Sequence, residues 1–347
     1  MSEKIKIAII GASGYTGQEL LRLLIMHPAV EIAAITSRKE AGNSVDSVFP
    51  RFRGARSVDQ LEFMEPDIDS IVATGAKAAF LALPHGVAYE FAGPLLSRGI
   101  RVIDLSADFR LNDLAVYEDF YGDHSAPELL SESVFGLPEI HGDAIRDTNL
   151  VASPGCYPTS ILLPLIPLLK NKLVDPTTIN ISSLSGSSGA GKTSNTAFSF
   201  VEVNESLRAY GAPKHRHVSE IEQELSLAFG ETVKISFVPH LMPVNQGIVT
   251  TTFVNLESGT DSAAIADALS CYDSSAFVRV LGEGVFADSK NVTRTNFIDI
   301  GWVIDTRTNR LILSSAEDNL GKGAGGQAIQ SFNLMFGLAE MAGLENF

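Results

Sequence analysis

Residues 5–27 constrain the fold more than any other stretch of the chain. Residues 5–10 form an apolar, β-branched run of the kind found in a strand buried on both faces. A G-x-x-G-x-x-G turn at 11–17 follows, and residues 18–27 then show helical periodicity. Glycines let the backbone approach a phosphate, and the helix N-terminus faces the anion. We therefore predict a dinucleotide-binding turn here, with an ordinary tight turn as the alternative. The cofactor candidates in it are Gly11, Ser13, Gly14, Tyr15, Thr16 and Gly17.

The end of the second predicted strand, residues 30–35, indicates which dinucleotide is bound. A carboxylate at such a strand end would bind the ribose 2′-hydroxyl of NAD. Ser37, Arg38 and Lys39 stand there instead, which suits the 2′-phosphate of NADP. Ser37 and Arg38 are therefore cofactor candidates, with a solvated basic loop as the alternative.

Further strands at 78–83 and 101–105 are separated by a helical segment at 87–97. This alternation predicts a Rossmann-like, doubly wound parallel sheet. Arg110 follows the last of these strands, at the sheet edge where ligands bind in open α/β folds. It is a candidate for holding a carboxylate or phosphate, with a structural salt bridge as the alternative.

The second half of the chain has a different pattern, with strands that no regular helices separate. It predicts an α+β domain with a mostly antiparallel sheet. The expected strands are 178–185, 232–239, 246–256, 297–304 and 310–315, and the expected helices are 198–209, 218–229, 261–271 and 323–339.

A chain of 347 residues exceeds what one core usually covers, so we expect two domains. We assign 1–154 plus 322–347 to NADP binding, and 155–321 to catalysis and oligomerisation.

The net charge of −15 argues against a nucleic acid partner. Two cysteines make no metal or disulfide framework, so no metal is expected. We expect neither a signal peptide nor a membrane span, and therefore a cytoplasmic protein.

Cys156 is the candidate nucleophile. An apolar run ends at Ser153-Pro154-Gly155, and Pro158 suits the first turn of a helix that would begin at the cysteine. Unpaired N–H groups at a helix N-terminus stabilise a thiolate and should lower the pKa of the thiol. The alternative is a small buried core residue, as most free cysteines are. Cys271, at the end of a surface helix, is interpreted as structural.

His217 and Glu220 begin a later helix and share one face of it. The carboxylate could orient the imidazole of a general acid or base. His215 and the neighbouring cations would add an electropositive patch that favours a thiolate and anionic ligands. The alternative is a basic helix start on the surface, and a metal site is disfavoured because a third ligand is absent.

Residues 186–193 match the P-loop pattern G-x-x-x-x-G-K-[ST]. A P-loop belongs to an early strand of a parallel sheet, whereas the surroundings here are antiparallel in character. We therefore interpret the segment as a loop that donates backbone N–H groups to a substrate anion, with a nucleotide triphosphatase as the disfavoured alternative.

Together these motifs resemble N-acetyl-γ-glutamyl-phosphate reductase of arginine biosynthesis, a relative of aspartate-semialdehyde dehydrogenase. The likeness runs nearly end to end, and we see no departure from it at the catalytic positions. Its stretches are Gly-Ala-Ser-Gly-Tyr-Thr-Gly at 11–17, Leu-Pro-His-Gly at 83–86, Asp-Leu-Ser-Ala-Asp-Phe-Arg at 104–110, Gly-Leu-Pro-Glu at 136–139, Pro-Gly-Cys-Tyr-Pro-Thr at 154–159, Ser-Gly-Ala-Gly-Lys at 188–192, His-Arg-His at 215–217, Pro-His-Leu-Met-Pro at 239–243 and Asp-Asn-Leu-Gly-Lys-Gly-Ala-Gly-Gly-Gln at 318–327.

The resemblance implies NADPH-dependent reduction of an acyl phosphate through a cysteine thioester. Cys156 would be the nucleophile, His217 the acid/base with His215 as the reserve, and Glu220 the group that orients it. Asn319 would contact the nicotinamide end of the cofactor. Arg110, Ser153, His215, Ser188 and Gly189 would bind the substrate, and the second domain would form a homo-oligomer, a dimer or a tetramer.

Two alternatives to this function remain open. One is a sister reductase that acts on aspartyl phosphate or on a carrier-linked aminoadipyl phosphate. The other is a catalytically silent, NADP-binding regulator, which the presence of both Cys156 and His217 disfavours.

Overall fold

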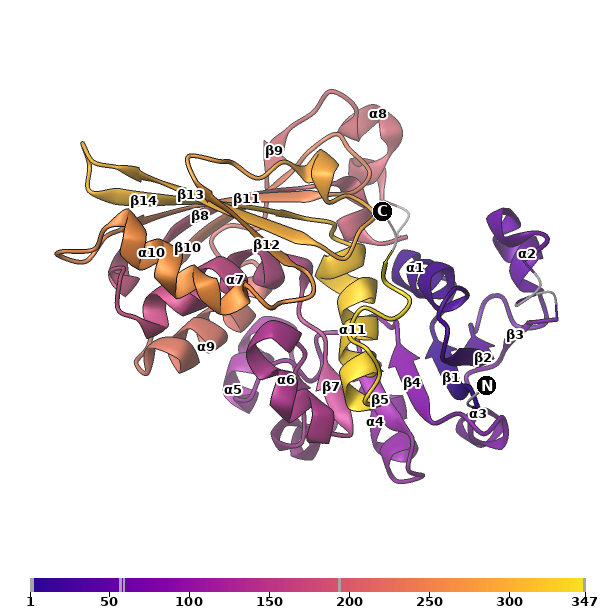
Figure 1. Cartoon of the computed structure of the whole chain (residues 1–347). Coiled ribbons are helices and arrows are strands. Elements are labelled where there is room, and N and C mark those ends of the chain that lie inside the picture. Colours follow the sequence, from indigo (N-terminus) through magenta and orange to yellow (C-terminus); the bar gives the residue numbers. More distant parts are fainter. Residues whose placement is uncertain (1–2, 56–57, 59, 193–194, 346–347) are drawn as a thin grey trace. The chain divides into compact units, whose positions relative to one another are not determined.

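The computed structural model describes residues 3–55, 58, 60–192 and 195–345 (Figure 1). The chain divides into two compact units, residues 1–154 with 324–346 and residues 155–323. The last helix, α11 (Gly326–Met335), belongs to the first unit and packs against α6 (Pro138–Asp147).

The first unit is built on a seven-stranded sheet in which every strand pair is parallel. The predicted Rossmann-like sheet is thereby confirmed. Its strand order is β3-β2-β1-β4-β5-β7-β6. The strands are β1 (Ile5–Ile10), β2 (Val30–Thr36), β3 (Phe63–Met64), β4 (Ala78–Leu81), β5 (Arg101–Asp104), β6 (Val134–Phe135) and β7 (Leu150–Ala152).

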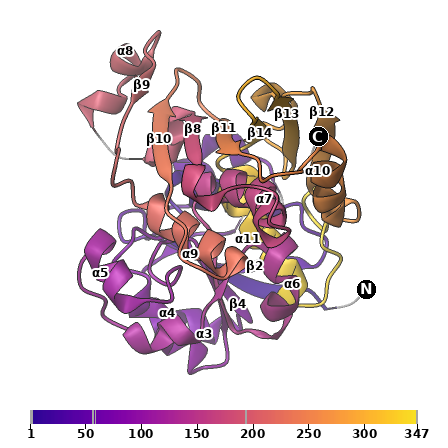
Figure 2. The same ribbon diagram turned by 90° about the vertical axis from the view of Figure 1, so that its left-hand side faces the viewer.

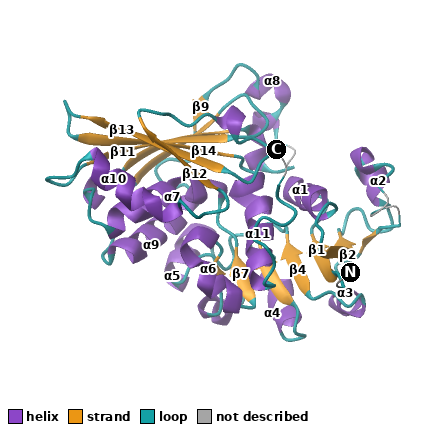
Figure 3. Ribbon diagram, viewed as in Figure 1, coloured by secondary structure: helices purple, strands orange, loops and turns teal. Residues whose placement is uncertain are grey.

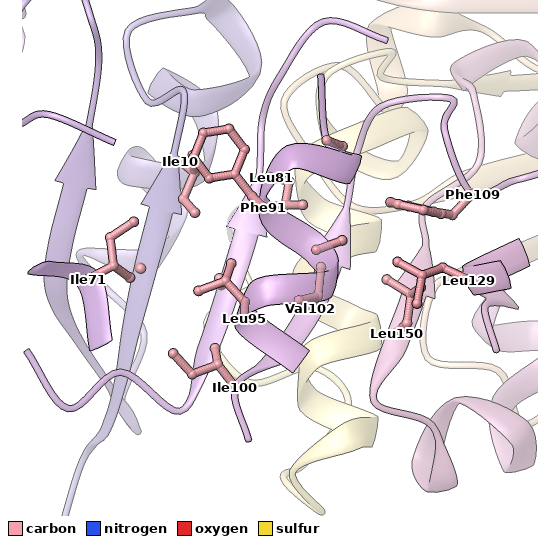
Figure 4. Packing of buried hydrophobic residues seen from close by; sticks show 14 of the residues in the cluster. Ile10, Ile71, Leu81, Phe91, Leu95, Ile100, Val102, Phe109, Leu129 and Leu150 are labelled. Carbon is pink, nitrogen blue, oxygen red and sulfur yellow. The ribbon is translucent and has the colours of Figure 1, made fainter. Parts of the chain in front are cut away.

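Helices cover this sheet, which explains its almost uninterrupted apolar strands. Figure 4 shows Phe91 and Leu95 of α4 beside the sheet residues Leu81 and Val102, all of them buried. The helices besides α6 and α11 are α1 (Tyr15–Leu24), α2 (Val45–Val48), α3 (Ile68–Ala73), α4 (Tyr89–Leu96) and α5 (Leu114–Tyr121), with short 3₁₀ turns η1 (Pro50–Phe52) and η2 (Pro127–Ser131).

The second unit contains a seven-stranded mixed sheet, whose strands are drawn in orange in Figure 3. Its strand order is β12-β13-β14-β11-β8-β10-β9. The β10/β8 and β12/β13 pairs are parallel, and the other strand pairs are antiparallel. The mostly antiparallel sheet predicted for this half is confirmed. Its strands are β8 (Asn180–Ser185), β9 (Arg208–Ala209), β10 (Ser236–Leu241), β11 (Ile248–Asn255), β12 (Val278–Glu283), β13 (Ile298–Asp305) and β14 (Arg310–Glu317).

Helix α7 (Cys156–Lys170) is the central helix of this unit and packs against α9 (His217–Phe229), β11 and β14 (Figure 2). The remaining helices are α8 (Phe200–Val203) and α10 (Ser262–Leu269). Short turns are η3 (Pro176–Thr178), η4 (Ser187–Ala190), η5 (Thr196–Phe198), η6 (Ser270–Tyr272) and η7 (Ser289–Asn291), and a π-helical turn, η8 (Gly321–Gly325), precedes α11.

Two prolines interrupt the hydrogen bonds inside α7, and side chains from elsewhere in the unit replace the missing donors. A proline lacks the N–H that would bond to the carbonyl four residues earlier. Pro164 therefore releases the carbonyl of Ser160, which accepts instead from the hydroxyl of Ser315 at 2.6 Å. Pro167 releases that of Leu163, which accepts from the hydroxyl of Tyr272 at 2.7 Å. Helix α7 is thus anchored at both interruptions.

The predicted helix at 198–209 is wrong. The chain there forms η5, α8 and β9. Asn204 leaves the helical conformation (φ −63°, ψ 132°), and Glu205 adopts a left-handed φ of 58°, which ends any helix. The strand predicted at 232–239 corresponds to β10, which begins four residues later, at Ser236.

The P-loop alternative does not fit the structure. A P-loop opens a helix, whereas the segment after β8 forms the single 3₁₀ turn η4. Strand β8 also pairs antiparallel with β11. Thr193, the last residue of the matching pattern, lies outside the described residues.

Candidate active site

Cys156 is the first residue of α7. Gly155 precedes it in extended conformation (φ −66°, ψ 158°) and, as a glycine, provides no side-chain cap to the helix. The first-turn N–H groups of a helix carry partial positive charge, which favours a thiolate at this position. The expected placement of the thiol at a helix N-terminus is therefore present in the structure, although the thiol's reactivity stays a prediction.

Two glycines make room around Cys156. A Cβ atom on Gly155 would lie only 2.4 Å from Nε2 of His217, so the imidazole sits directly against the residue before the cysteine. A Cβ on Gly323 would lie 2.9 Å from Cβ of Cys156 and 3.0 Å from Oε1 of Glu317. Neither position has space for a side chain, so both glycines are required for this packing.

Glu220 connects the cysteine loop to the histidine helix. Its fully buried carboxylate accepts a hydrogen bond from the backbone N–H of Gly155 through Oε2, at 2.9 Å. Its Oε1 lies 4.0 Å from Nε2 of His217, which is too long for a hydrogen bond but close enough for an ion pair with an imidazolium. The structure therefore brings Cys156, His217 and Glu220 to one place within the second unit.

His215 lies beside His217 with its ring surrounded by aromatic rings. The centroids of Tyr157, Tyr210 and Phe237 are 5.6, 5.7 and 5.6 Å away, and that of His217 is 4.9 Å away. Burial, with a smaller contribution from the Arg216 charge, lowers the pKa of His215 to about 4. His215 is therefore neutral near pH 7, so it does not add positive charge to the site, contrary to the expectation from sequence.

Asn319 holds two loops of the second unit together. Its Oδ1 accepts from the backbone N–H of Gly247 at 2.9 Å, and its Nδ2 donates to the hydroxyl of Ser188 at 2.8 Å. A Cβ on Gly189 would lie 3.7 Å from the same Nδ2, so Gly189 also belongs to this cluster. One amide N–H of Asn319 remains for a cofactor, and that contact stays a prediction.

In the first unit, close packing requires two of the three glycines of the dinucleotide turn. Gly11 has a φ of 81°, and a Cβ there would lie 2.5 Å from the carbonyl oxygen of Ala82. Gly14 precedes α1 without a side-chain cap, and a Cβ on Gly17 would lie 2.5 Å from Cα of Ala12. The backbone at Ser13 and the first-turn residues Tyr15 and Thr16 can therefore meet a phosphate.

The end of β2 offers a hydroxyl and a cation. The hydroxyl of Ser37 lies 3.0 Å from that of Ser13 and accepts from the backbone N–H groups of Lys39 and Glu40. Arg38 forms an exposed ion pair with Glu90 at 3.0 Å. Exposed pairs are weak, so this contact leaves the guanidinium available to a phosphate.

Arg110 and Ser153 are both buried in the first unit. Nη2 of Arg110 donates to the carbonyl of Leu105 at 3.0 Å. Ser153 follows β7, and its backbone N–H donates to the carbonyl of Asp104 at 2.8 Å. The Ser153 hydroxyl is buried and has no hydrogen-bond partner among the described residues, as expected of a group that binds a ligand.

Asp108 is a residue that sequence reasoning missed, although the Ser-Ala-Asp-Phe-Arg stretch contains it. Its fully buried carboxylate accepts from the backbone N–H groups of Gly86, Val87 and Ala88 at 2.6, 3.1 and 2.9 Å. It also accepts from the hydroxyl of Tyr117 at 3.1 Å. Asp108 thus fixes the loop after β4, whose first residues contact Gly11 of the dinucleotide turn.

Asp104, at the end of β5, lies close enough to Asp108 to be affected by its charge. Burial raises the pKa of Asp104 to about 7, with the Asp108 carboxylate as the second cause. Hydrogen bonds from the backbone N–H and hydroxyl of Ser106 act in the opposite direction.

Curated relatives decide the family. A protein of Akkermansia muciniphila named N-acetyl-gamma-glutamyl-phosphate reductase is 54% identical over 99% of this chain and 99% of its own length. A Geobacter metallireducens protein of the same name is 49% identical over 98% of each chain. The chain belongs to the N-acetyl-gamma-glutamyl-phosphate reductase family. The family predicted from the sequence is therefore confirmed, and with it the oxidoreductase class.

Family models and solved structures agree with this reductase assignment. Residues 6–148 match the model described as "Semialdehyde dehydrogenase, NAD binding domain", and residues 156–319 match "Semialdehyde dehydrogenase, dimerisation domain". Residues 6–148 lie in the first unit, and this match agrees with the predicted NADP cofactor.

Two solved aspartate-semialdehyde dehydrogenases share the fold of this family member. Enzyme II of Vibrio cholerae, complexed with ASA, has a TM-score of 0.72 at 18% identity. The Candida albicans enzyme with NADP has a TM-score of 0.73 at 15% identity. Each match covers 96% of this chain and 99% of the other.

No described helix is both long and apolar enough to cross a membrane. Nor do the described residues bring three or more His, Cys, Asp or Glu side chains together as a metal site.

Proposed function

We propose that this chain reduces N-acetyl-γ-glutamyl phosphate to N-acetylglutamate 5-semialdehyde with NADPH, releasing inorganic phosphate, as a step of arginine biosynthesis. The relatives named for this activity support the substrate. The placement of His217 against Gly155, directly before Cys156, supports the chemistry.

The proposed reaction begins at Cys156. Its thiolate attacks the acyl carbon, the C–O bond to phosphate breaks, and a thioester remains on the sulfur. Ser153, Ser188, Gly189 and Arg110 are the groups we assign to the substrate and its anionic phosphate. Backbone N–H groups at the start of α7 would stabilise the oxyanion that forms on attack.

NADPH, when bound, supplies the hydride that reduces the thioester carbon. The glycine turn at 11–17 would hold its phosphates, and Ser37 and Arg38 its 2′-phosphate. Asn319 is proposed to meet the nicotinamide end through its remaining N–H. These residues fit a dinucleotide because Gly14 provides no side-chain cap to α1 and because Ser37 and Arg38, not a carboxylate, follow β2.

His217 serves as the acid/base in this proposal. As an imidazolium, it gives a proton to the oxyanion formed on hydride addition, and as an imidazole it takes that proton back when the thiohemiacetal collapses to aldehyde and thiolate. Glu220, at 4.0 Å from Nε2, would stabilise the imidazolium without transferring the proton itself.

We further propose that the first unit binds NADP and that the second carries catalysis and assembly, close to the predicted division at 1–154 plus 322–347 and 155–321. The match to a dimerisation domain supports a homo-oligomer, and exposed apolar side chains of the second unit, such as Phe200 and Val201, are candidates for its interface. A cytoplasmic location is proposed from the biosynthetic role.

The reverse reaction tests the substrate. Phosphate-dependent reduction of NADP should proceed with N-acetylglutamate 5-semialdehyde and should be at least about a hundredfold slower, in kcat/KM, with aspartate semialdehyde, since the site's polar groups would lose their partners. Preference for aspartate semialdehyde would establish the sister reductase. No activity with either aldehyde, despite NADP binding, would favour the silent regulator.

A further inference from the structure

His215 makes two hydrogen bonds at the start of α9 that resemble those of a helix-capping residue. Its ring Nδ1 accepts a hydrogen bond from the backbone N–H of His217 at 3.2 Å. Its carbonyl accepts from the backbone N–H of Val218 at 2.9 Å. A capping residue makes this pair of contacts, because its side chain accepts from the N–H two or three positions on while its carbonyl begins the helix. Arg216, the residue between His215 and α9, already has helical dihedral angles (φ −54°, ψ −38°) and makes no side-chain cap. The imidazole of His215 therefore accepts the hydrogen bond that Asn or Asp usually accepts at a helix start.

The surroundings of the ring keep Nδ1 able to accept. A hydrogen bond from a backbone N–H requires a lone pair on Nδ1, so the ring proton must be on Nε2. The four neighbouring aromatic rings partly shield the half-buried imidazole from water and disfavour its charged form. The lowered pKa of His215 agrees with this geometry.

His217, whose backbone N–H is capped by His215, is also the residue that packs closely against Gly155. The imidazole of His217 lies against Gly155 with no space for even a methyl group between them. A shift in the first turn of α9 would therefore move the imidazole relative to Gly155 and Cys156. A displacement of about 1 Å can cost a hundredfold in rate.

We propose that His215 is a positioning residue, whose Nδ1 caps the first turn of α9 and thereby fixes the imidazole of His217 beside Cys156. This rests on the proposed function, in which His217 is the acid/base. It differs from the role in substrate binding predicted from the sequence, which would use Nε2 as a donor to an anion.

Paired substitutions distinguish the two roles. The side-chain oxygen of Asn corresponds to Nδ1 of histidine, whereas the amide nitrogen of Gln reaches the position of Nε2. We expect His215→Asn to keep kcat within about threefold, and His215→Gln and His215→Ala to lower it about ten- to a hundredfold with KM for the acyl phosphate little changed. Rescue by Gln and not by Asn, with a raised KM in His215→Asn, would overturn the proposal.

A double-mutant cycle provides the second test. If His215 acts only through His217, then adding His215→Ala to a His217→Ala enzyme should change kcat and KM less than about twofold. Independent, multiplying losses would show that His215 contacts the substrate directly.

A third measurement does not depend on activity. Exchange of the His217 backbone amide with solvent, followed by NMR, should accelerate in His215→Ala and stay near the parent rate in His215→Asn. An unchanged rate in His215→Ala would overturn the capping role. If the exchange result holds but the parent protein lacks reductase activity, the cap stands and the proposed function fails.

Discussion

The carboxylate of Glu220 accepts a hydrogen bond from the backbone N–H of Gly155 at 2.9 Å, across 65 positions of sequence. The same carboxylate lies 4.0 Å from the imidazole of His217. One buried side chain therefore ties the loop before Cys156 to the helix that carries the histidine. Such a group has two effects when it is changed, one on the loop and one on the imidazole.

Cys156→Ser should fold and bind NADPH but lose reduction, because a serine hydroxyl does not ionise appreciably at neutral pH. Cys271→Ser is the matched control and should turn over normally, since Cys271 is exposed at the end of a helix. For both variants, steady-state assays would measure reduction, and a fluorescence titration would measure NADPH binding. Substantial turnover by Cys156→Ser would rule out the covalent mechanism.

Removal of the imidazole in His217→Ala should lower kcat by a factor on the order of 10²–10⁴, the usual contribution of a positioned proton donor. Glu220→Gln should cost less, because an amide oxygen can still accept from Gly155 while the charge beside the imidazole is lost. The comparison requires kcat and KM for both variants, with circular dichroism as a folding control. A larger loss in Glu220→Gln than in His217→Ala would contradict the assigned roles.

Arg38→Ala should erode the preference for NADPH over NADH, because it removes a charge-assisted hydrogen bond to the 2′-phosphate. Such bonds contribute about 1.5–3 kcal/mol, or roughly ten- to a hundredfold in affinity. Glu90→Gln is the control, since it removes the ion-pair partner of Arg38 and should not weaken NADPH binding. Equal use of both cofactors by the parent protein would refute the assignment.

Asp104→Asn and Asp108→Asn should differ in their effect on stability and on its pH dependence. Between about pH 4 and 7, folded Asp104 binds a proton that the unfolded chain releases, because its pKa is raised in the folded state. The free energy of unfolding should therefore fall as the pH rises through this window. Asp104→Asn should remove that component of the pH dependence and cost little stability at neutral pH, as measured by urea unfolding at several pH values.

Asp108→Asn should be destabilising at all of these pH values. The Asp108 carboxylate accepts from three backbone N–H groups and one hydroxyl, and an amide nitrogen would face some of these donors. Each unsatisfied buried donor costs about 1–3 kcal/mol. We also expect a raised KM for NADPH, because the loop held by Asp108 contacts the dinucleotide turn. Equal stability of the two variants would contradict this contrast.

Ser315→Ala and Tyr272→Phe should each destabilise the protein by about 1–3 kcal/mol, since each leaves a buried carbonyl of α7 without its donor. Ser270→Ala is a suitable control, because the exposed Ser270 hydroxyl donates to the carbonyl of Asp267, three residues earlier at the end of α10. Urea unfolding would measure the free energy of unfolding of all three variants. Control-like stability of the two test variants would show that other groups or water satisfy these carbonyls.

Much of the fold could be predicted because the strands have the composition of buried strands. Residues 5–10 and 30–35 read as β-branched apolar runs, and they form β1 and β2. The two-residue strands β3 and β6 have too few residues to produce a pattern. The helix predicted at 198–209 is wrong because Glu205 adopts a left-handed conformation, which nothing in its side chain predicts.

The site could be predicted where its residues are neighbours in sequence. His217 and Glu220 share a helix face, which follows from their spacing. The bond from Gly155 to Glu220 and the bond from Ser315 to Ser160 could not be found in this way, because only the folded chain brings these residues together. The neutral state of His215 depends likewise on rings from Tyr157 and Phe237.

The contact between Gly155 and His217 has a consequence for comparing other chains. The imidazole occupies the volume that any side chain at position 155 would fill. A homologue with alanine or serine at 155 must therefore hold its histidine elsewhere or lack it. Residues 155 and 217 should accordingly vary together across homologous sequences, and a chain with a larger residue at 155 should not be assigned this chemistry without its own structure.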